Sequence, residues 1–261
     1  MNLILGIPSL LELGEVEQQC RFAVSLGLQF IELNLDLPQF QPDVLPVLKL
    51  KELAKHYELS FSLHLPENLD LALFQEESRS GNLQYLKNIF SWAAKSEIKV
   101  AVLHLPQGVH FSLPEGKVLL YDNFFERFQT NLLYSFESVS KAASAANVTI
   151  CLENTGSWQQ KCISRVLPEL LKLPNIAVCY DLGHAMRGGN AGLLWNTYQS
   201  SIRHLHLHQA ENGRDHLPID SLSDGLRQCL QLAEERNLPA VIEVKTAEAL
   251  RESEIFLRKY K

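Results

Sequence analysis

VTICLENT, at residues 148–155, combines an apolar strand pattern with an acidic end. Val148, Ile150 and Leu152 fall on one face, because the side chains of a strand alternate between two faces. The apolar run then stops at Glu153. Burying an ionised carboxylate is costly unless the group is paired or bound to a metal. The segment therefore indicates a short buried strand that ends at a residue with a chemical role.

Seven other segments show similar apolar runs, and with this one they predict eight strands. The expected strands lie at residues 2–7, 30–35, 60–65, 99–105, 148–153, 176–181, 202–208 and 240–244. The expected helices alternate with them, at residues 14–26, 44–57, 83–96, 121–146, 160–171, 193–201, 222–236 and 247–259. Continuous Val, Ile and Leu runs are typical of strands buried on both faces, and eight strand–helix units in roughly 250 residues are typical of a barrel.

The expected fold class is therefore α/β, with residues 1–261 forming a single (β/α)₈ TIM barrel domain. A doubly wound open sheet is the alternative. The first strand–helix turn, Ile7-Pro8-Ser9, lacks the glycine-rich phosphate motif of that fold, and this disfavours the open sheet.

Composition limits the classes of function. The chain is 46% hydrophobic and 21% charged with a net charge of −6, so it has no general basic field for a polyanion. Five cysteines without a CxxC pair indicate free thiols in a reducing compartment, and we expect a cytoplasmic location. The first residues lack a signal-peptide pattern and no apolar run reaches membrane-spanning length, so no membrane partner is expected.

Acidic and imidazole side chains gather at one end of the expected strands. In such a barrel the active site lies at the C-terminal ends of the strands. Seven of the eight strands carry a candidate at or near that end: Glu32, His64, His104, Glu153, Asp181, His206 and Glu243. Three more candidates follow in loops: His184, Asp215 and His216. Oxygen and nitrogen donors of this kind suit zinc, manganese, cobalt or magnesium.

Simpler explanations exist for several of these residues. His64 and His104 are each equally compatible with a hydrogen-bonded core histidine. Glu32 is compatible with an ion pair to a neighbouring Lys or Arg. Residues 214–216, Arg-Asp-His, have the composition of a polar turn.

Three histidines share one face of the strand at residues 202–208, and at most one or two of them can reach a metal: His204, His206 and His208. His204 lies deepest along the strand and is expected to be structural. Which of the other two reaches the metal is not decided by the spacing alone.

The strand ends resemble those of the xylose isomerase-like TIM barrels, a superfamily with sugar and sugar-phosphate isomerases and epimerases and the endonuclease IV family. The similar motifs cover nearly the whole chain: HLPENLDL, VLHLPQG, ICLENT, VCYDLGH, HLHLHQAENGRDHLP and IEVKT. The resemblance implies a shared divalent metal held by four residues that match Glu153, Asp181, His206 and Glu243. His208 is the alternative to His206.

The first functional hypothesis from this resemblance is a metal-dependent isomerase or epimerase. The metal would polarise a sugar carbonyl and stabilise an enediolate. Glu153 and Glu243 would remove and return the proton, and His184 and Arg214 would hold substrate hydroxyls or a phosphate. The partner would be a small sugar-like or phosphorylated molecule. Dimers and tetramers are common in the superfamily, so a homo-oligomer fits the resemblance, although the sequence identifies no interface.

The second hypothesis is phosphodiester hydrolysis, because endonuclease IV enzymes use three metals. Their additional ligands match His64, His104, His184 and His216. The Asp-x-His pair of that family appears here as Arg-Asp-His at residues 214–216, so one ligand is displaced or missing. The loops lack an aromatic, Lys- and Arg-rich surface, so a non-DNA phosphoester is expected rather than nucleic acid. A non-catalytic binding barrel is the third hypothesis, and it predicts eroded ligands.

Overall fold

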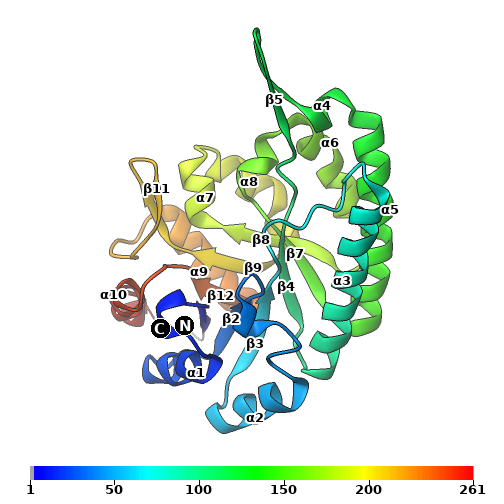
Figure 1. Cartoon of the computed structure of the whole chain (residues 1–261). Helices are drawn as coiled ribbons and strands as arrows, with labels where there is room; N and C mark the ends of the chain where they lie inside the picture. Colours follow the sequence, from blue (N-terminus) through cyan, green and yellow to red (C-terminus); the bar gives the residue numbers. More distant parts are fainter. Residues whose placement is uncertain (1–2, 261) are drawn as a thin grey trace.

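Eight parallel strands close into a barrel, and helices cover its outside (Figure 1). The structure is a computed structural model that describes residues 3–260. In order around the barrel, the strands are β1 (Ile4–Pro8), β12 (Pro239–Ile242), β9 (Ile202–Leu207), β8 (Ile176–Asp181), β7 (Thr149–Glu153), β4 (Val100–His104), β3 (Ser60–His64) and β2 (Phe30–Asn34). The predicted (β/α)₈ barrel is confirmed, and the open sheet is excluded because β1 pairs with β12. The expected start of the first strand at Asn2 lies outside the described residues.

The helices follow the strands along the chain, as a parallel barrel requires. They are α1 (Val16–Ser25), α2 (Val47–Tyr57), α3 (Glu76–Lys95), α4 (Leu120–Asn123), α5 (Phe125–Ala146), α6 (Lys161–Leu170), α7 (Leu182–Arg187), α8 (Ala191–Tyr198), α9 (Asp224–Arg236) and α10 (Ala247–Leu257). α3 begins seven residues before the predicted start at residue 83, because its first turns are polar and exposed and show no apolar period. The predicted helix at 121–146 is interrupted at Phe124.

The register of the ladder brings the polar strand ends together. His104 on β4 pairs with Glu153 on β7, and Asp181 on β8 pairs with His206 on β9. Cys151 lies one alternation below Glu153 on the same face, in a small buried cluster with Val102, Ala177 and Cys179. This apolar layer closes the barrel interior beneath the polar edge.

Two hairpins occupy segments for which the sequence predicted only loops. The first consists of β5 (His110–Leu113) and β6 (Gly116–Leu119), and it extends away from the barrel in Figure 1. The second consists of β10 (Gln209–Glu211) and β11 (Arg214–Leu217). Its turn, Asn212-Gly213, has positive φ angles of 53° and 78°, which Asn-Gly accepts readily in a tight hairpin. The polar-turn explanation for residues 214–216 is therefore wrong, because these residues lie in a strand.

All five cysteines are free and buried: Cys20, Cys151, Cys162, Cys179 and Cys229. None of the helices within residues 3–260 has both the length and the apolar content to cross a membrane.

Candidate metal centre

Four side chains from four strands meet at the C-terminal edge of the barrel. Their ligand atoms all lie within 4.8 Å of one another, and all four residues are buried: Glu153, Asp181, His206 and Glu243. His206 Nδ1 lies 2.9 Å from Glu243 Oε2 and 3.4 Å from Glu153 Oε2. Asp181 Oδ2 lies 3.8 Å from the same nitrogen. The structure thus brings together the four residues that the sequence selected as ligands.

Three polar atoms that face this point are buried without a hydrogen bond of regular geometry from any described residue: His184 Nδ1, His206 Nδ1 and Glu243 Oε2. Such atoms are rare in folded proteins, because an unsatisfied buried polar group costs about 1–3 kcal/mol. A divalent cation between them would satisfy the two nitrogens and the carboxylates at once. Carboxylate oxygens with imidazole nitrogens are a donor set that zinc and manganese accept. The residues present therefore fit a metal.

Glu32 fixes the orientation of the His206 ring. Glu32 Oε1 lies 2.9 Å from His206 Nε2, on the side of the ring opposite the centre. Its other oxygen accepts hydrogen bonds from Ser62 at 3.0 Å and pairs with His204 Nε2 at 2.8 Å. The suggested ion pair of Glu32 with Lys or Arg is therefore wrong, because the interior of the barrel offers it imidazoles. His204 is fully buried, as expected of a structural residue.

A first histidine pair flanks the four-residue centre. His104 Nε2 lies 3.1 Å and His64 Nε2 lies 3.4 Å from Glu153 Oε2. The two rings meet edge to face, with centroids 4.8 Å apart. His64 Nδ1 lies 3.0 Å from the carbonyl oxygen of Leu65, which orients the other ring nitrogen toward Glu153. The structure places both histidines at the centre rather than in the apolar core.

A second histidine group lies on the other side. The ring nitrogens of its members come within 4.8 Å of one another: His184, His208 and His216. His208 Nε2 lies 3.0 Å from Asp181 Oδ1, and the rings of His208 and His216 stack at 4.4 Å. His206 thus lies in the four-residue centre, whereas His208 belongs to this second group.

The remaining candidates from the sequence lie at the rim of the second histidine group. Asp215 forms an ion pair with Arg187 and lies 3.7 Å from His184 Nε2. Arg214 is exposed on β11.

The carboxylates of the centre are held ionised by their neighbours. Burial would raise the pKa of Glu153, but His104 and His206 outweigh burial and hold the pKa well below its usual range. Burial would also raise the pKa of Glu243, but His206 and Lys245 lower it. Lys245 Nζ lies 2.8 Å from Glu243 Oε1. Both carboxylates are therefore ionised and available to a cation.

The pKa values of two flanking histidines are raised, whereas those of the carboxylates are lowered. Burial would lower the pKa of His64, but Glu153 raises it to about 9. For His184, burial is outweighed by Asp181 and Glu153, and the pKa again rises to about 9. Without a metal these rings carry protons at neutral pH, so a cation that binds there must displace protons.

Three contributing residues were not selected from the sequence. Asn154 donates to the Asp181 carbonyl at 2.9 Å and accepts from the Asp181 N–H at 2.7 Å, so it fixes the end of β8. Lys245 lies two residues after Glu243, just beyond the end of β12, and that spacing was a readable signal. Arg187 depends on the course of α7, a helix that the sequence did not predict.

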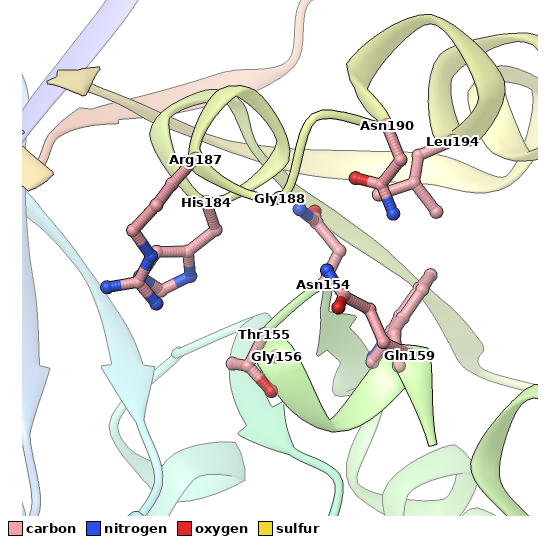
Figure 2. Close-up of a pocket in the computed structure, with 10 residues that line it drawn as sticks. Asn154, Thr155, Gly156, Gln159, His184, Arg187, Gly188, Asn190 and Leu194 are labelled. Atoms are coloured by element: carbon pink, nitrogen blue, oxygen red, sulfur yellow. The ribbon is translucent and has the colours of Figure 1, made fainter. Parts of the chain in front are cut away.

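Two hollows adjoin the centre. One has a volume of about 300 Å³ and lies against His184 (Figure 2). The other has a volume of about 460 Å³ and lies against His104, between the segment after β3 and the segment after β4. Both give access from solvent toward the polar strand ends.

The closed barrel with a buried carboxylate–imidazole centre at its C-terminal edge defines a (β/α)₈ barrel protein with a candidate metal site. The model of the xylose isomerase-like TIM barrel family matches residues 20–259. The chain belongs to this family.

Similar proteins include an uncharacterized protein, MJ1614, from Methanocaldococcus jannaschii. It is 27% identical over 172 residues, which cover 64% of this chain and 63% of that protein. The matched region is thus less than two thirds of that relative.

Among solved structures, a D-tagatose 3-epimerase-like protein has a TM-score of 0.77 at 22% identity and covers 99% of this chain and 97% of its own. 3-Keto-D-glucoside 4-epimerase from E. coli also has a TM-score of 0.77, at 17% identity, with 99% and 100% covered. The TTHB071 protein from Thermus thermophilus, soaked with ZnCl2, is 26% identical with a TM-score of 0.69, and 99% and 97% are covered. The structural neighbours thus include sugar epimerases with the same fold.

Proposed function

We propose that this protein is a metal-dependent isomerase or epimerase of a sugar or sugar phosphate. One observation carries the proposal: Glu153 and Glu243 converge on His206 Nδ1, at 3.4 and 2.9 Å, beside Asp181. These residues would hold a divalent cation, which would supply Lewis acidity at adjacent substrate oxygens. The names of the structurally similar epimerases support the same reaction class.

The two glutamates would act as an acid/base pair. Each is ionised, because nearby cationic groups keep its pKa low. One carboxylate would take the proton from the carbon next to the substrate carbonyl, and the other would pass to that carbon a proton from the protonated group beside it, His184 for Glu153 or Lys245 for Glu243. His184 Nδ1 lies 3.2 Å from Glu153 Oε1, and Lys245 lies beside Glu243, so each carboxylate has a group that can steady its charge.

A second candidate function is multinuclear metal-dependent hydrolysis of a phosphoester. It is favoured because, in each of two carboxylates, the two oxygens face different histidines. Glu153 directs Oε2 toward His64 and His104 and Oε1 toward His184. Asp181 directs Oδ1 toward His208 and Oδ2 toward His206. Carboxylates divided in this way can bridge neighbouring metals, as two-metal phosphoesterases require.

Metal content and two variants distinguish the candidates. For the isomerase we expect about one metal per chain, and deuterium uptake from D2O at the carbon next to the carbonyl. Glu153→Gln should abolish that exchange, whereas His104→Ala should reduce it only mildly. The exposed Glu137→Gln is the control and should behave as the wild type.

Two outcomes would redirect the assignment. Two or three zinc ions per chain, with loss of phosphodiesterase activity in His104→Ala, would select the hydrolase. Full turnover of Glu153→Gln on every substrate tested would exclude this centre as the catalytic site.

A further inference from the structure

The hollow beside His184 differs in charge from the centre that it adjoins. It is bounded by the turn after β7, which contains Trp158 and Gln159, and by α7 with the residues after it (Figure 2). Among the described residues that line it there is no carboxylate, and Arg187 is a permanently charged cation there. The centre next to it holds three buried carboxylates: Glu153, Asp181 and Glu243. A ligand that spans both would meet a cation site at one end and a donor-rich hollow at the other.

Arg187 retains hydrogen-bonding capacity in this position. Its Nη1 pairs with Asp215. A guanidinium has five N–H donors in a planar fork, so most of them remain for a second partner. The side chain is 43% exposed, and it lies next to the His184 ring on the same helix (Figure 2). A planar fork of this kind matches two oxygens of a phosphate or carboxylate.

Trp158 supplies an apolar part of the wall. It lines the hollow and is only 6% exposed, and its ring meets Tyr198 edge to face with centroids 5.3 Å apart. Its Nε1 is itself buried, so a ligand in the hollow would contact the ring and not the N–H.

Apart from Arg187 and His184, the described residues that line the hollow are uncharged, and two of them pack closely against Gly188. A Cβ atom on Gly188 would come within 2.9 Å of Gln159 Nε2 and 3.0 Å of Asn190 Oδ1. The missing side chain thus lets both amides lie against the backbone at this point. The hollow measures about 300 Å³, at the lower end of the range for small-molecule sites.

We propose that this hollow binds the phosphate group of a phosphorylated sugar whose carbonyl end reaches the metal centre, with Arg187 as the charged donor to the phosphate. The proposal rests on the proposed function for the reacting end and narrows its substrate class to sugar phosphates. Asp215 competes with the phosphate for Arg187. Loss of Arg187 should therefore weaken binding, and neutralisation of Asp215 should strengthen it.

Calorimetric titration of the metal-loaded protein with inorganic phosphate tests this directly, without turnover. We expect Arg187→Met to weaken phosphate binding at least tenfold, with Arg187→Lys intermediate because it keeps the charge and loses the fork. Arg227→Met is the matched control, because Arg227 is exposed on α9 and does not line the hollow, and its affinity should equal that of the wild type.

The possible outcomes test the phosphate site separately from the proposed isomerase or epimerase reaction. Equal phosphate affinity in wild type and Arg187→Met would overturn the proposal and would place the anion on the metal instead. Acetate that binds as tightly as phosphate would also overturn it, in favour of a carboxylate. If phosphate binding depends on Arg187 but no sugar phosphate is epimerised, the hollow is correctly assigned and the reaction class alone is wrong.

Discussion

At the scale of single residues, His206 is the best-defined candidate ligand because each of its ring nitrogens faces a different partner. Nε2 faces Glu32 at 2.9 Å, and Nδ1 faces the carboxylates of the centre. A carboxylate behind a metal-binding imidazole fixes the tautomer and raises the basicity of the coordinating nitrogen. Glu32 therefore acts as a positioning residue.

Replacing Glu32 by Gln keeps the size of the side chain and one acceptor oxygen, but removes the charge behind His206. We expect metal affinity to fall about 10- to 100-fold, while the far-ultraviolet circular dichroism stays that of the wild type. Competition with a chromophoric chelator measures the affinity. Glu137→Gln, on the surface, should leave it unchanged. Unaltered affinity in Glu32→Gln would show that His206 needs no such support.

The strand-end residues of the centre were predictable, and their individual contacts were not. Alternation along a strand and the parallel order of a barrel place Glu153 and Asp181 at one edge whatever the loops do. The partner of Glu32 lies across the barrel on β9, so it depends on the registers of strands distant in sequence. Arg187 reaches its position only through the path of the chain after β8.

At the scale of elements, the first turn of α7 packs directly on the end of β9. A Cβ atom built on Gly183 would lie 1.9 Å from Cε1 of the His208 ring. Only glycine permits this approach, and the N-cap carboxylate of Asp181 accepts the His184 N–H at the same turn. The second histidine group thus depends on the way in which one short helix meets one strand.

Gly183→Ala should push His208 out of place and lower the free energy of unfolding by about 1–3 kcal/mol, the usual cost of overpacking. Urea denaturation measures the loss. Gly192→Ala in α8 is the matched control, because a Cβ there meets nothing within 4 Å. It should be neutral or slightly stabilising, since alanine favours a helix over glycine. Equal stability of the two variants would contradict the close packing described here.

The boundaries of the strands show where the sequence patterns were sufficient to predict the structure. Strands with continuous apolar runs were placed to within one or two residues, whereas both hairpins were missed. The β10–β11 hairpin did carry a signal, because Asn212-Gly213 favours a tight turn. The strands β5 and β6 are largely exposed, with Phe111 at 53%, so they have no buried face to create a period-two pattern.

At the scale of the whole molecule, protons and the proposed metal would compete for the same centre, and this would link the stability of the barrel to pH. The folded-state pKa of His64 and of His184 is about 9. An unfolded histidine titrates near 6.5. The metal-free fold therefore binds more protons than the unfolded chain between these values, and its stability falls as pH rises through that window.

Chelator-treated protein should lose free energy of unfolding from pH 6.5 to pH 9, with the contribution of both rings fully present below pH 6.5. Saturating zinc should reverse this trend, because a metal displaces the protons and binds more tightly as pH rises. Urea denaturation at pH 6.5, 7.5 and 9, with and without zinc, measures both slopes. A metal-free protein that gains stability across this range would contradict the assigned protonation.

The ligands of the centre come from strands spread along the chain, from His64 on β3 to Glu243 just after β12. During synthesis the N-terminal strands emerge first, and the last carboxylate leaves the ribosome only after the other seven strands. A nascent chain can therefore offer isolated histidines to a metal but not the complete cage. Metal acquisition would then be a late event in the life of the molecule, and a loaded centre would show that translation and barrel closure had both been completed.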